Sequence, residues 1–488
     1  MIHRLPLSLW LATLATLVLM ACDPTYSLSP AIDYSDPAVS GDQYERESEN
    51  PFIQVSEQPV STFSIDADGA SYANTRRYLG QEQNLPPAAA IRTEEFINYF
   101  DLDYPADNPN DPISLNGEVS ACPWNLDHRL IRIGIQGENI PLSQLPATNF
   151  VFLIDVSGSM GGDDRLDLLK EGFEILVEEL TAQDRISIVT YAGSSRVLLE
   201  STPGDDKRAI NKAIRKLKSG GSTGGAEGII TAYEIAQANF ITGGNNRVII
   251  GTDGDFNVGI SDTDQLIELI EEKRDAGVFL TVLGVGRGNL NDAMLEQLSN
   301  HGNGTFEYLD KVEQLEKVFL HERDKFVAVA KDVKVQVAFE PEKVEAYRLI
   351  GYENRVLDTE DFTNDSTDAG EIGAGQNITA LYEIVPAPPN GKSEPSFTID
   401  FRYKEPDASV SQPMELAIFD EGTSFEDASD HQQFITSVAA FALILGNSDY
   451  KGTATYDKVL QWVDLSQLDD PHGYKAEFRE LVERAGGM

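Results

Sequence analysis

The sequence predicts an α/β protein: a doubly wound domain with a flanking β-sandwich, an N-terminal α/β module and a C-terminal helical region. Three observations support this. Between residues 149 and 325, short apolar strands alternate with amphipathic helices, a pattern typical of a doubly wound parallel sheet. Residues 326–426 contain alternating strand patterns, and residues 427–488 return to helical periodicity. With 488 residues and 41% hydrophobic content, the chain has room for two to four domains.

The first 22 residues have the features of a secretion signal. His3 and Arg4 precede an uncharged apolar stretch over residues 5–20, which is short for a membrane-spanning helix and typical of a signal-peptide core. The following Leu-Met-Ala-Cys resembles the lipobox of bacterial lipoproteins. That resemblance implies that Cys22 becomes the acylated N-terminus, anchored in the inner or outer membrane of a bacterial cell envelope. An ordinary secretory signal with an incidental cysteine is the alternative.

The next two segments differ in composition. Residues 23–59 are rich in Ser, Pro, Asp and Glu, so they should form a flexible acidic tether. Residues 60–148 regain apolar periodicity and should form a small mixed module. Within it, helices are expected at 71–83 and 91–100, and strands at 113–124 and 128–137.

The remaining elements follow from the same periodicities. In the doubly wound domain, strands are expected at 150–154, 185–192, 196–200, 247–252 and 278–286, and helices at 166–180, 207–218, 225–240 and 263–277. Antiparallel strands are expected at 331–340, 345–353, 378–385 and 396–404, and final helices at 434–445, 455–464 and 474–485. We expect the strands before and after the doubly wound domain to share one sandwich, because each half alone would expose half a core.

Charge and cysteine content exclude some classes of function. Acidic residues outnumber basic residues 80 to 38, for a formal net charge of −42, so nucleic acid is not an expected partner. The chain has two cysteines, Cys22 and Cys122. If Cys22 carries lipid, no intrachain disulfide forms. Cys122 lies among apolar neighbours with no nearby base, which predicts a buried, unreactive thiol.

Three oxygen donors follow the first strand of the doubly wound domain. The apolar run 150–154 leads directly into Asp155, Ser157 and Ser159. A doubly wound sheet binds its ligand beyond the carboxyl ends of the strands that flank the reversal of strand order. These three side chains are therefore expected at a ligand site.

Two later segments can add donors to this site. The strand at 247–252 is followed by Asp253, and a Gly-rich turn contains Thr223. Two carboxylates and three hydroxyls form an all-oxygen site suited to Mg²⁺, with Mn²⁺ or Ca²⁺ as substitutes. The sequence therefore predicts a divalent-cation site made by Asp155, Ser157, Ser159, Thr223 and Asp253.

The motifs "DVSGSM", "GGSTGG" and "GTDGD" resemble the metal-ion-dependent adhesion site of von Willebrand factor A domains. This resemblance implies that the serines and Thr223 coordinate the metal, that the two aspartates act directly or through water, and that a Glu or Asp of a protein partner fills the open position. Ser222 intervenes between the glycines and Thr223, so Ser222 is an alternative ligand.

The resemblance covers nearly the whole mature chain. The segments "STFSIDADGASYANTRRYL", "EEFINYF", "ACPWN", "AYRLIGYENR", "DAGEIGAG" and "YKGTATYDKV" are similar to the flanking regions of the YfbK type of bacterial von Willebrand factor A lipoproteins. Together with the lipobox, the resemblance to a metal-ion-dependent adhesion site implies metal-dependent protein binding, in adhesion or envelope assembly, by a lipid-anchored protein. The donors have no nucleophile–base pair beside them in the sequence, so we expect binding and not enzymatic catalysis.

Three different functions are also compatible with the sequence. The first is enzymatic: residues 65–71, "IDADGAS", resemble the opening of haloacid dehalogenase-type phosphatases, in which Asp66 would be the nucleophile and Asp68 the acid/base. A phosphatase of this type needs a buried strand of a doubly wound sheet before Asp66. The second is a structural envelope scaffold without metal-dependent binding. The third is an accessory subunit of an ATPase system.

Overall fold

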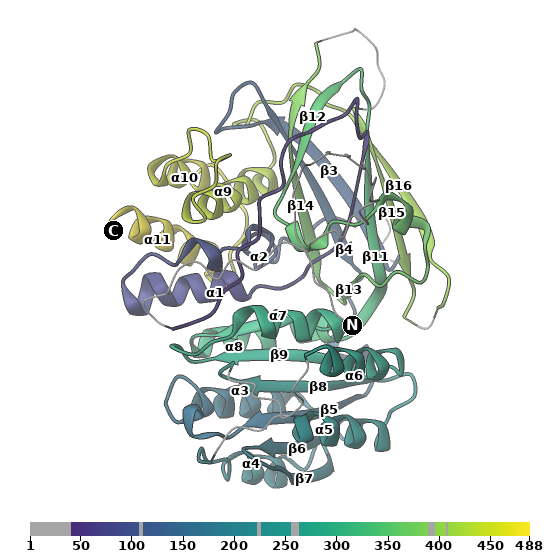
Figure 1. Cartoon of the computed structure of the whole chain (residues 1–488), viewed down its shortest axis with the longest axis vertical. Helices are drawn as coiled ribbons and strands as arrows, with labels where there is room; N and C mark the ends of the chain where they lie inside the picture. The colour runs from purple at the N-terminus through teal and green to yellow at the C-terminus, as the bar shows by residue number, and fades with distance from the viewer. Residues whose placement is uncertain (1–40, 107–110, 222–225, 255–262, 389–395, 407) are drawn as a thin grey trace, which may run out of the picture.

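The computed structural model describes residues 41–106, 111–221, 226–254, 263–388, 396–406 and 408–488. It consists of an α/β domain and a second body in which a β-sandwich packs beside a group of helices (Figure 1). Cys22 of the predicted anchor, and Ser222 and Thr223 of the predicted metal site, lie outside the described residues.

The α/β domain is built on a six-stranded sheet with the order β10-β9-β8-β5-β6-β7. Its strands are β5 (Thr148–Asp155), β6 (Arg185–Tyr191), β7 (Ser195–Pro203), β8 (Asn245–Thr252), β9 (Phe279–Val285) and β10 (Phe306–Leu309). Strand order reverses at β5, which pairs in parallel with β6 on one side and with β8 on the other. The predicted doubly wound fold is confirmed, and β5 and β8 are neighbours at the switch point.

The edge strand β7 differs from the expected parallel arrangement, because it pairs antiparallel with β6. Only three residues separate the two strands, and the middle one, Gly193, has a positive φ of 77°. A turn of this length can form a hairpin, whereas a parallel connection needs a crossover of about a dozen residues or more. The prediction that the strand at 196–200 joins the parallel set was therefore wrong.

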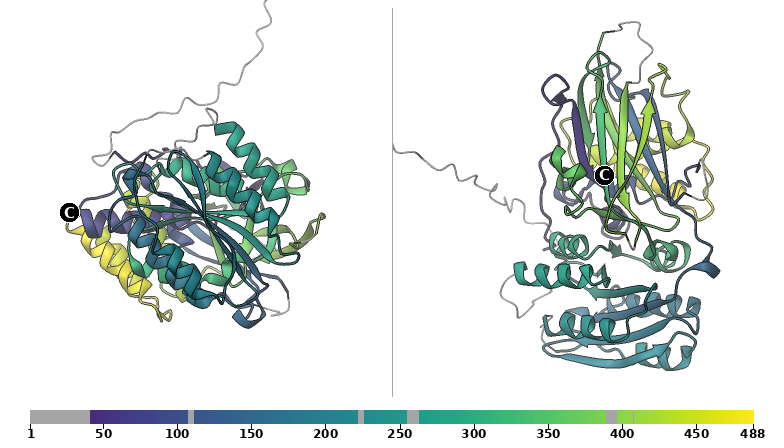
Figure 2. Two further views of the ribbon diagram at one scale, coloured as in Figure 1. Left: turned by 90° about the horizontal axis from the view of Figure 1, so that it is seen from below. Right: turned by 90° about the vertical axis from the view of Figure 1, so that its right-hand side faces the viewer.

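Helices cover both faces of this sheet (Figure 2). They are α3 (Leu166–Glu179), α4 (Lys207–Ile214), α5 (Ala226–Ala238), α6 (Thr263–Asp275), α7 (Asp292–His301) and α8 (Val312–Glu316). Alternate residues of β5 enter different cores: Phe152 packs with α3, α4 and α8, and Leu153 packs with α5, α6 and α7. Burial on both faces explains why β5 is an uninterrupted apolar run.

The second body contains a β-sandwich of two antiparallel sheets. One sheet has the order β1-β12-β14-β4-β3, with β1 (Ile53–Gln54), β3 (Ile113–Ala121), β4 (Arg129–Gly137), β12 (Val344–Ile350) and β14 (Asn377–Pro386). The other has the order β13-β11-β15-β16, with β2 (Val60–Ser64) also paired to β11; its strands are β11 (Ala328–Phe339), β13 (Gly370–Gly373), β15 (Phe397–Lys404) and β16 (Gln412–Ile418). The two inner faces share one apolar core.

In each sheet of the sandwich, a strand that precedes the α/β domain in the sequence pairs with a strand that follows it. β4 pairs with β14 from Arg129↔Ile384 to Gln136↔Asn377, and β2 pairs with β11 from Val60↔Ala338 to Ser64↔Lys334. The expectation of one shared sandwich, with the α/β domain inserted between its halves, is confirmed.

A group of helices packs beside the sandwich. It comprises α1 (Ala70–Arg77), α2 (Thr93–Ile97), α9 (Asp430–Leu445), α10 (Tyr456–Val463) and α11 (Tyr474–Gly486). Aromatic side chains from both ends of the chain form its core, with Phe100 near Phe434 and Phe478 at ring-centroid distances of 5.0 and 5.7 Å. Residues 60–148 are thus divided: their strands join the sandwich, and their helices join the C-terminal helices.

Helix α1 connects the two bodies. It packs along β10, the edge strand of the α/β sheet, and covers that edge. Arg76, on α1, forms a buried ion pair with Asp310 directly after β10, at 2.5 Å. The same guanidinium reaches Glu477 of α11 at 2.9 Å, so one side chain joins the α/β domain, α1 and the C-terminal helices.

Candidate metal centre

The predicted donors from the first loop lie together at the carboxyl end of β5. Asp155 is the last residue of this strand and is fully buried. Its Oδ1 accepts a hydrogen bond from the Ser157 backbone N–H at 2.8 Å. A short 3₁₀ turn, Gly158–Met160, then brings the hydroxyls of Ser157 and Ser159 to 2.9 Å from each other. Three of the predicted donors are therefore gathered by local backbone geometry.

The second carboxylate comes from the neighbouring strand. Ile154 of β5 pairs with Gly251 of β8, so Asp253, directly after β8, follows the adjacent strand at the same edge of the sheet. Asp253 is also fully buried. Thr252, which the sequence motifs did not single out, donates its hydroxyl to Asp155 Oδ2 at 3.3 Å. The sequence could have indicated Thr252, because it directly precedes the predicted ligand Asp253 in "GTDGD".

The electrostatics of the site favour a cation. Burial, together with the nearby charge of Asp253, raises the pKa of Asp155 to about 6. A bound divalent cation would relieve both the burial cost and the repulsion between the two carboxylates. Two carboxylates and two hydroxyls, without thiolate or imidazole, fit Mg²⁺, Mn²⁺ or Ca²⁺. Within the described ranges, no three His, Cys, Asp or Glu side chains gather into a metal-binding group, so the hydroxyls are essential to this candidate.

The Gly-rich segment reaches the site by its backbone. The Gly220 N–H donates to the Val156 carbonyl at 2.8 Å, and the Gly158 N–H donates to the Gly221 carbonyl at 3.2 Å. The described chain stops at Gly221, one residue before Ser222. The choice between Ser222 and Thr223 as the third hydroxyl stays a prediction.

Residues 156–164, between β5 and α3, form what we call the metal loop. Arg165, another residue that the sequence motifs did not reveal, joins this loop to the loop after β9. Its guanidinium donates to the carbonyl oxygens of Ser159 and Arg287. The side chain crosses Gly286, whose φ is +76° and where an added Cβ would meet Arg165 Nε at 2.3 Å. Position 286 therefore requires glycine for two reasons, and the two loops are held as a unit. Arg165 carries no motif that could have predicted this contact.

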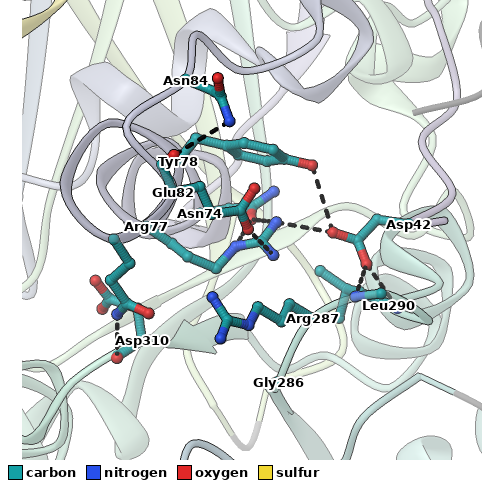
Figure 3. Close-up of polar contacts among 12 residues, drawn as sticks. Asp42, Asn74, Arg77, Tyr78, Glu82, Asn84, Gly286, Arg287, Leu290 and Asp310 are labelled. Atoms are coloured by element: carbon teal, nitrogen blue, oxygen red, sulfur yellow. Dashed lines mark hydrogen bonds and ion pairs between the residues drawn. The ribbon is translucent and has the colours of Figure 1, made fainter. Parts of the chain in front are cut away.

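The first described residues of the chain dock onto the same loop after β9 (Figure 3). Asp42 accepts hydrogen bonds from the backbone N–H groups of Gly288 and Leu290 at 2.6 and 3.1 Å. Its other oxygen pairs with Arg77 of α1 at 2.8 Å, and both side chains are at most 2% exposed. Asp42 lies inside residues 23–59, which the sequence predicted to be a flexible tether. That prediction is wrong for Asp42, which is docked beside a loop that Arg165 connects to the candidate metal site, and for β1, which pairs with β12 of the sandwich.

The remaining residues considered from the sequence have structural partners. Asp66 pairs with Arg355 at 2.9 Å, and Asp68 accepts a hydrogen bond from the Phe306 backbone N–H at 2.8 Å. The strand before them, β2, is antiparallel and belongs to the sandwich, so the strand context required for a phosphatase of the haloacid dehalogenase type is absent. Cys122 is buried, and burial raises the pKa of its thiol.

Comparisons with known proteins agree with this organisation. Residues 149–321 match the family described as von Willebrand factor type A domain, residues 38–132 match one described as von Willebrand factor, and residues 324–488 match one described as uncharacterized protein YfbK, C-terminal. The uncharacterized protein YfbK of Escherichia coli (strain K12) is 40% identical over 472 residues, which cover 91% of this chain and 81% of that protein. The chain belongs to the YfbK family. The membership predicted from the motifs is confirmed.

Solved structures with lower similarity were also found. A von Willebrand factor type A protein from Catenulispora acidiphila is 16% identical, with a TM-score of 0.43, and the match covers 76% of this chain and 88% of that one. The conserved hypothetical protein BatB from Bacteroides thetaiotaomicron is 21% identical, with a TM-score of 0.32, and covers 37% and 98% respectively. A von Willebrand factor A domain in a YfbK-family chain indicates a role in protein interaction or adhesion.

Proposed function

We propose that this protein is a membrane-anchored lipoprotein that binds a protein partner through a divalent cation held by its von Willebrand factor A domain. The observation that carries the proposal is the donor set at the switch point. Asp155 is the last residue of β5 and is followed by Ser157 and Ser159, and Asp253 comes directly after the neighbouring strand β8. Ser222 or Thr223 would supply the remaining hydroxyl.

The chain's own residues prepare this site for binding. The Ser157 N–H and the Thr252 hydroxyl fix the orientation of the Asp155 carboxylate. Arg165 holds the metal loop against the loop after β9. A bound Mg²⁺ would supply a coordination position for a carboxylate oxygen of the partner, a Glu or an Asp. No nucleophile–base pair was identified beside these donors in the described residues, which favours binding over covalent catalysis.

The proposed anchor is the lipid on Cys22. In the part of the chain that the structure describes, no helix is long and apolar enough to cross a membrane. A lipid on Cys22, followed by the acidic tether, would hold the folded body at a bacterial envelope membrane and leave the metal site free to meet a partner. Such a location outside the cytoplasm disfavours a role as an ATPase subunit, because that system needs ATP.

Crosslinking and pull-down from envelope extracts test the proposal. The wild type and Asp155→Ala are compared, each with Mg²⁺ and with EDTA. Asp163→Ala is the matched control, because Asp163 is an exposed carboxylate in the same loop. We expect a partner that is captured by the wild type and by the control in Mg²⁺, and lost with EDTA or with Asp155→Ala. An identical set of captured proteins in every condition would reject metal-dependent binding and favour a structural scaffold.

A further inference from the structure

A basic surface lies on an otherwise acidic chain. Residues 207–218 contain no Asp or Glu, although acidic residues outnumber basic ones 80 to 38 in the whole sequence. The basic residues of this segment, which comprises α4 and the turn after it, are Lys207, Arg208, Lys212, Arg215, Lys216 and Lys218. β7 and α4 lie at the edge of the α/β sheet farthest from the β-sandwich (Figure 1), so the second body leaves this surface open.

The packing of α4 directs these charges to solvent. Its apolar side is buried in the domain core through Ile210, Ala213 and Ile214. Two of the basic residues bind to groups of the neighbouring helix α3. Lys207 Nζ donates to backbone carbonyls at the end of α3, including Val177, and Arg215 pairs with Glu174 of α3 at 2.8 Å.

Four basic side chains remain available. Arg208, Lys212, Lys216 and Lys218 are exposed, and no ion pair involves them within the described ranges. We call these four residues the basic face of α4. Three of them, Arg208, Lys212 and Lys216, lie on one open part of the surface together with Asn211.

The topology of the sheet brings this face beside the metal loop. Because β7 runs antiparallel to β6, it ends at the edge of the sheet opposite the metal site, and α4 then returns toward that site. The chain arrives there at Gly220 and Gly221, whose backbones bond to Val156 and Gly158 of the metal loop. Lys218 is only two residues before Gly220. The basic face therefore leads along α4 to one side of the candidate metal site.

The charges on the metal loop itself are of the opposite sign. Asp163 is exposed and Asp164 is half-buried, and both follow the 3₁₀ turn of the metal loop. Arg287 lies 3.8 Å from Asp164. An approaching acidic chain would be repelled by these carboxylates and attracted by the basic face of α4, which defines a preferred direction of approach.

We infer that the basic face of α4 recognises an acidic segment of the protein partner, next to the carboxylate that would enter the metal site. This inference rests on the proposed function and specifies the chemistry of the partner. A protein with a net charge of −42 repels acidic ligands over most of its surface, and a local basic face overcomes that repulsion at the binding site. An anionic membrane is the less favoured ligand, because the apolar side of α4 is buried and cannot insert into lipid.

A labelled oligoglutamate peptide is a suitable probe. The protein is a soluble form that begins at residue 23, which keeps every described residue. The affinity of the protein for the labelled peptide is measured by fluorescence anisotropy in Mg²⁺ and in EDTA, at low and at physiological ionic strength. The test variant is Lys212→Glu/Lys216→Glu. The matched control is Lys451→Glu/Lys458→Glu, which makes the same change in net charge beside α10, on the second body.

We expect the test variant to bind the peptide at least ~10-fold more weakly than the wild type, with the larger difference at low ionic strength. The control should stay within about twofold of the wild type at physiological ionic strength, because α10 lies on the second body and α4 at the far end of the α/β domain (Figure 1), and salt screens charges that far apart. The inference is overturned if the test variant binds like the wild type, or if the wild type does not bind the peptide. It is also overturned if the test variant and the control differ in their binding to vesicles that contain phosphatidylglycerol but do not differ in their binding to the peptide.

A second readout separates this inference from the proposed function. Mg²⁺ should raise the melting temperature of the wild type and of Lys212→Glu/Lys216→Glu equally, because neither lysine is a metal ligand. If Mg²⁺ binding persists while the peptide affinities of both variants equal that of the wild type, only the basic face is rejected. If Mg²⁺ has no effect on the wild type, the proposed metal function fails.

Discussion

Replacing Asp155 by Asn should stabilise the metal-free protein and, at the same time, remove its response to Mg²⁺. The Asp155 carboxylate is fully buried, and its pKa is raised from 3.8 to about 6 by burial and by the charge of Asp253. That difference corresponds to a cost of about 3 kcal/mol for the ionised form at pH 7. Asparagine keeps an oxygen that can accept the Ser157 N–H bond while removing the charge.

The sign of the pH dependence follows from the same shift. Because the pKa of Asp155 is higher in the folded state, the folded protein bears the full free-energy cost of a buried, ionised carboxylate above about pH 6. The cost disappears as the pH falls toward 3.8, the ordinary value, where the carboxyl is neutral in both states. The difference in stability between the wild type and Asp155→Asn should therefore be largest at pH 7 and shrink toward pH 4.

Thermal unfolding after treatment with a chelator measures this effect. For the α/β domain, residues 149–325, a gain in stability of about 3 kcal/mol on replacing Asp155 by Asn corresponds to a rise in melting temperature of about 6–12 °C. Added Mg²⁺ at about 100 times its Kd should stabilise the wild type by about 2.7 kcal/mol and leave Asp155→Asn unchanged. Asp163→Asn, on an exposed carboxylate of the same loop, is the control for both measurements. A metal-free Asp155→Asn protein no more stable than the wild type at pH 7 would refute the reasoning about the buried charge.

Three further predictions concern the anchor, the docked N-terminal segment and the helical core. Cys22→Ser should release the protein from the membrane fraction or leave it unprocessed, and firm membrane association of the processed variant would contradict the lipid anchor. Asp42→Ala removes the acceptor for the Gly288 and Leu290 N–H groups, while Arg77 keeps Glu82 as an ion-pair partner, so the docked segment should lose about 1.5–3 kcal/mol; trypsin should then cut faster after Arg46, and an unchanged cleavage rate would argue against docking. Phe441→Ala removes a fully buried ring in contact with Phe478 and Tyr456, so urea denaturation should show a loss of about 3–5 kcal/mol; a loss below about 1 kcal/mol would show that the helices contribute little to the fold.

The local parts of the fold and site could be read from the sequence. The uninterrupted apolar run at 150–154 predicted a strand buried on both faces, because only such a strand can lack polar residues on either side. The donors Asp155, Ser157 and Ser159 are adjacent in the chain, so the geometry of one loop is enough to gather them. The return of strand patterns after residue 325 was enough to predict the shared sandwich, since half a sandwich exposes half a core.

Other features depend on contacts between distant segments. The turn between β6 and β7 is too short for a parallel crossover, but the composition of 196–200 is the same for either strand direction. Arg165 and Asp42 acquire their roles by bonding to backbone groups of residues 287–290, and backbone groups leave no signature in the sequence. The basic face of α4 is visible as a run of charge, yet its place beside the metal loop follows from the reversal at β7 and the bonds of Gly220 and Gly221. The sequence alone determined which residues offer donor atoms for a metal site, because it gives the side-chain types and their spacing along the chain. The tertiary structure decided which of them meet, because strand order and loop packing are settled only when the whole core is buried at once.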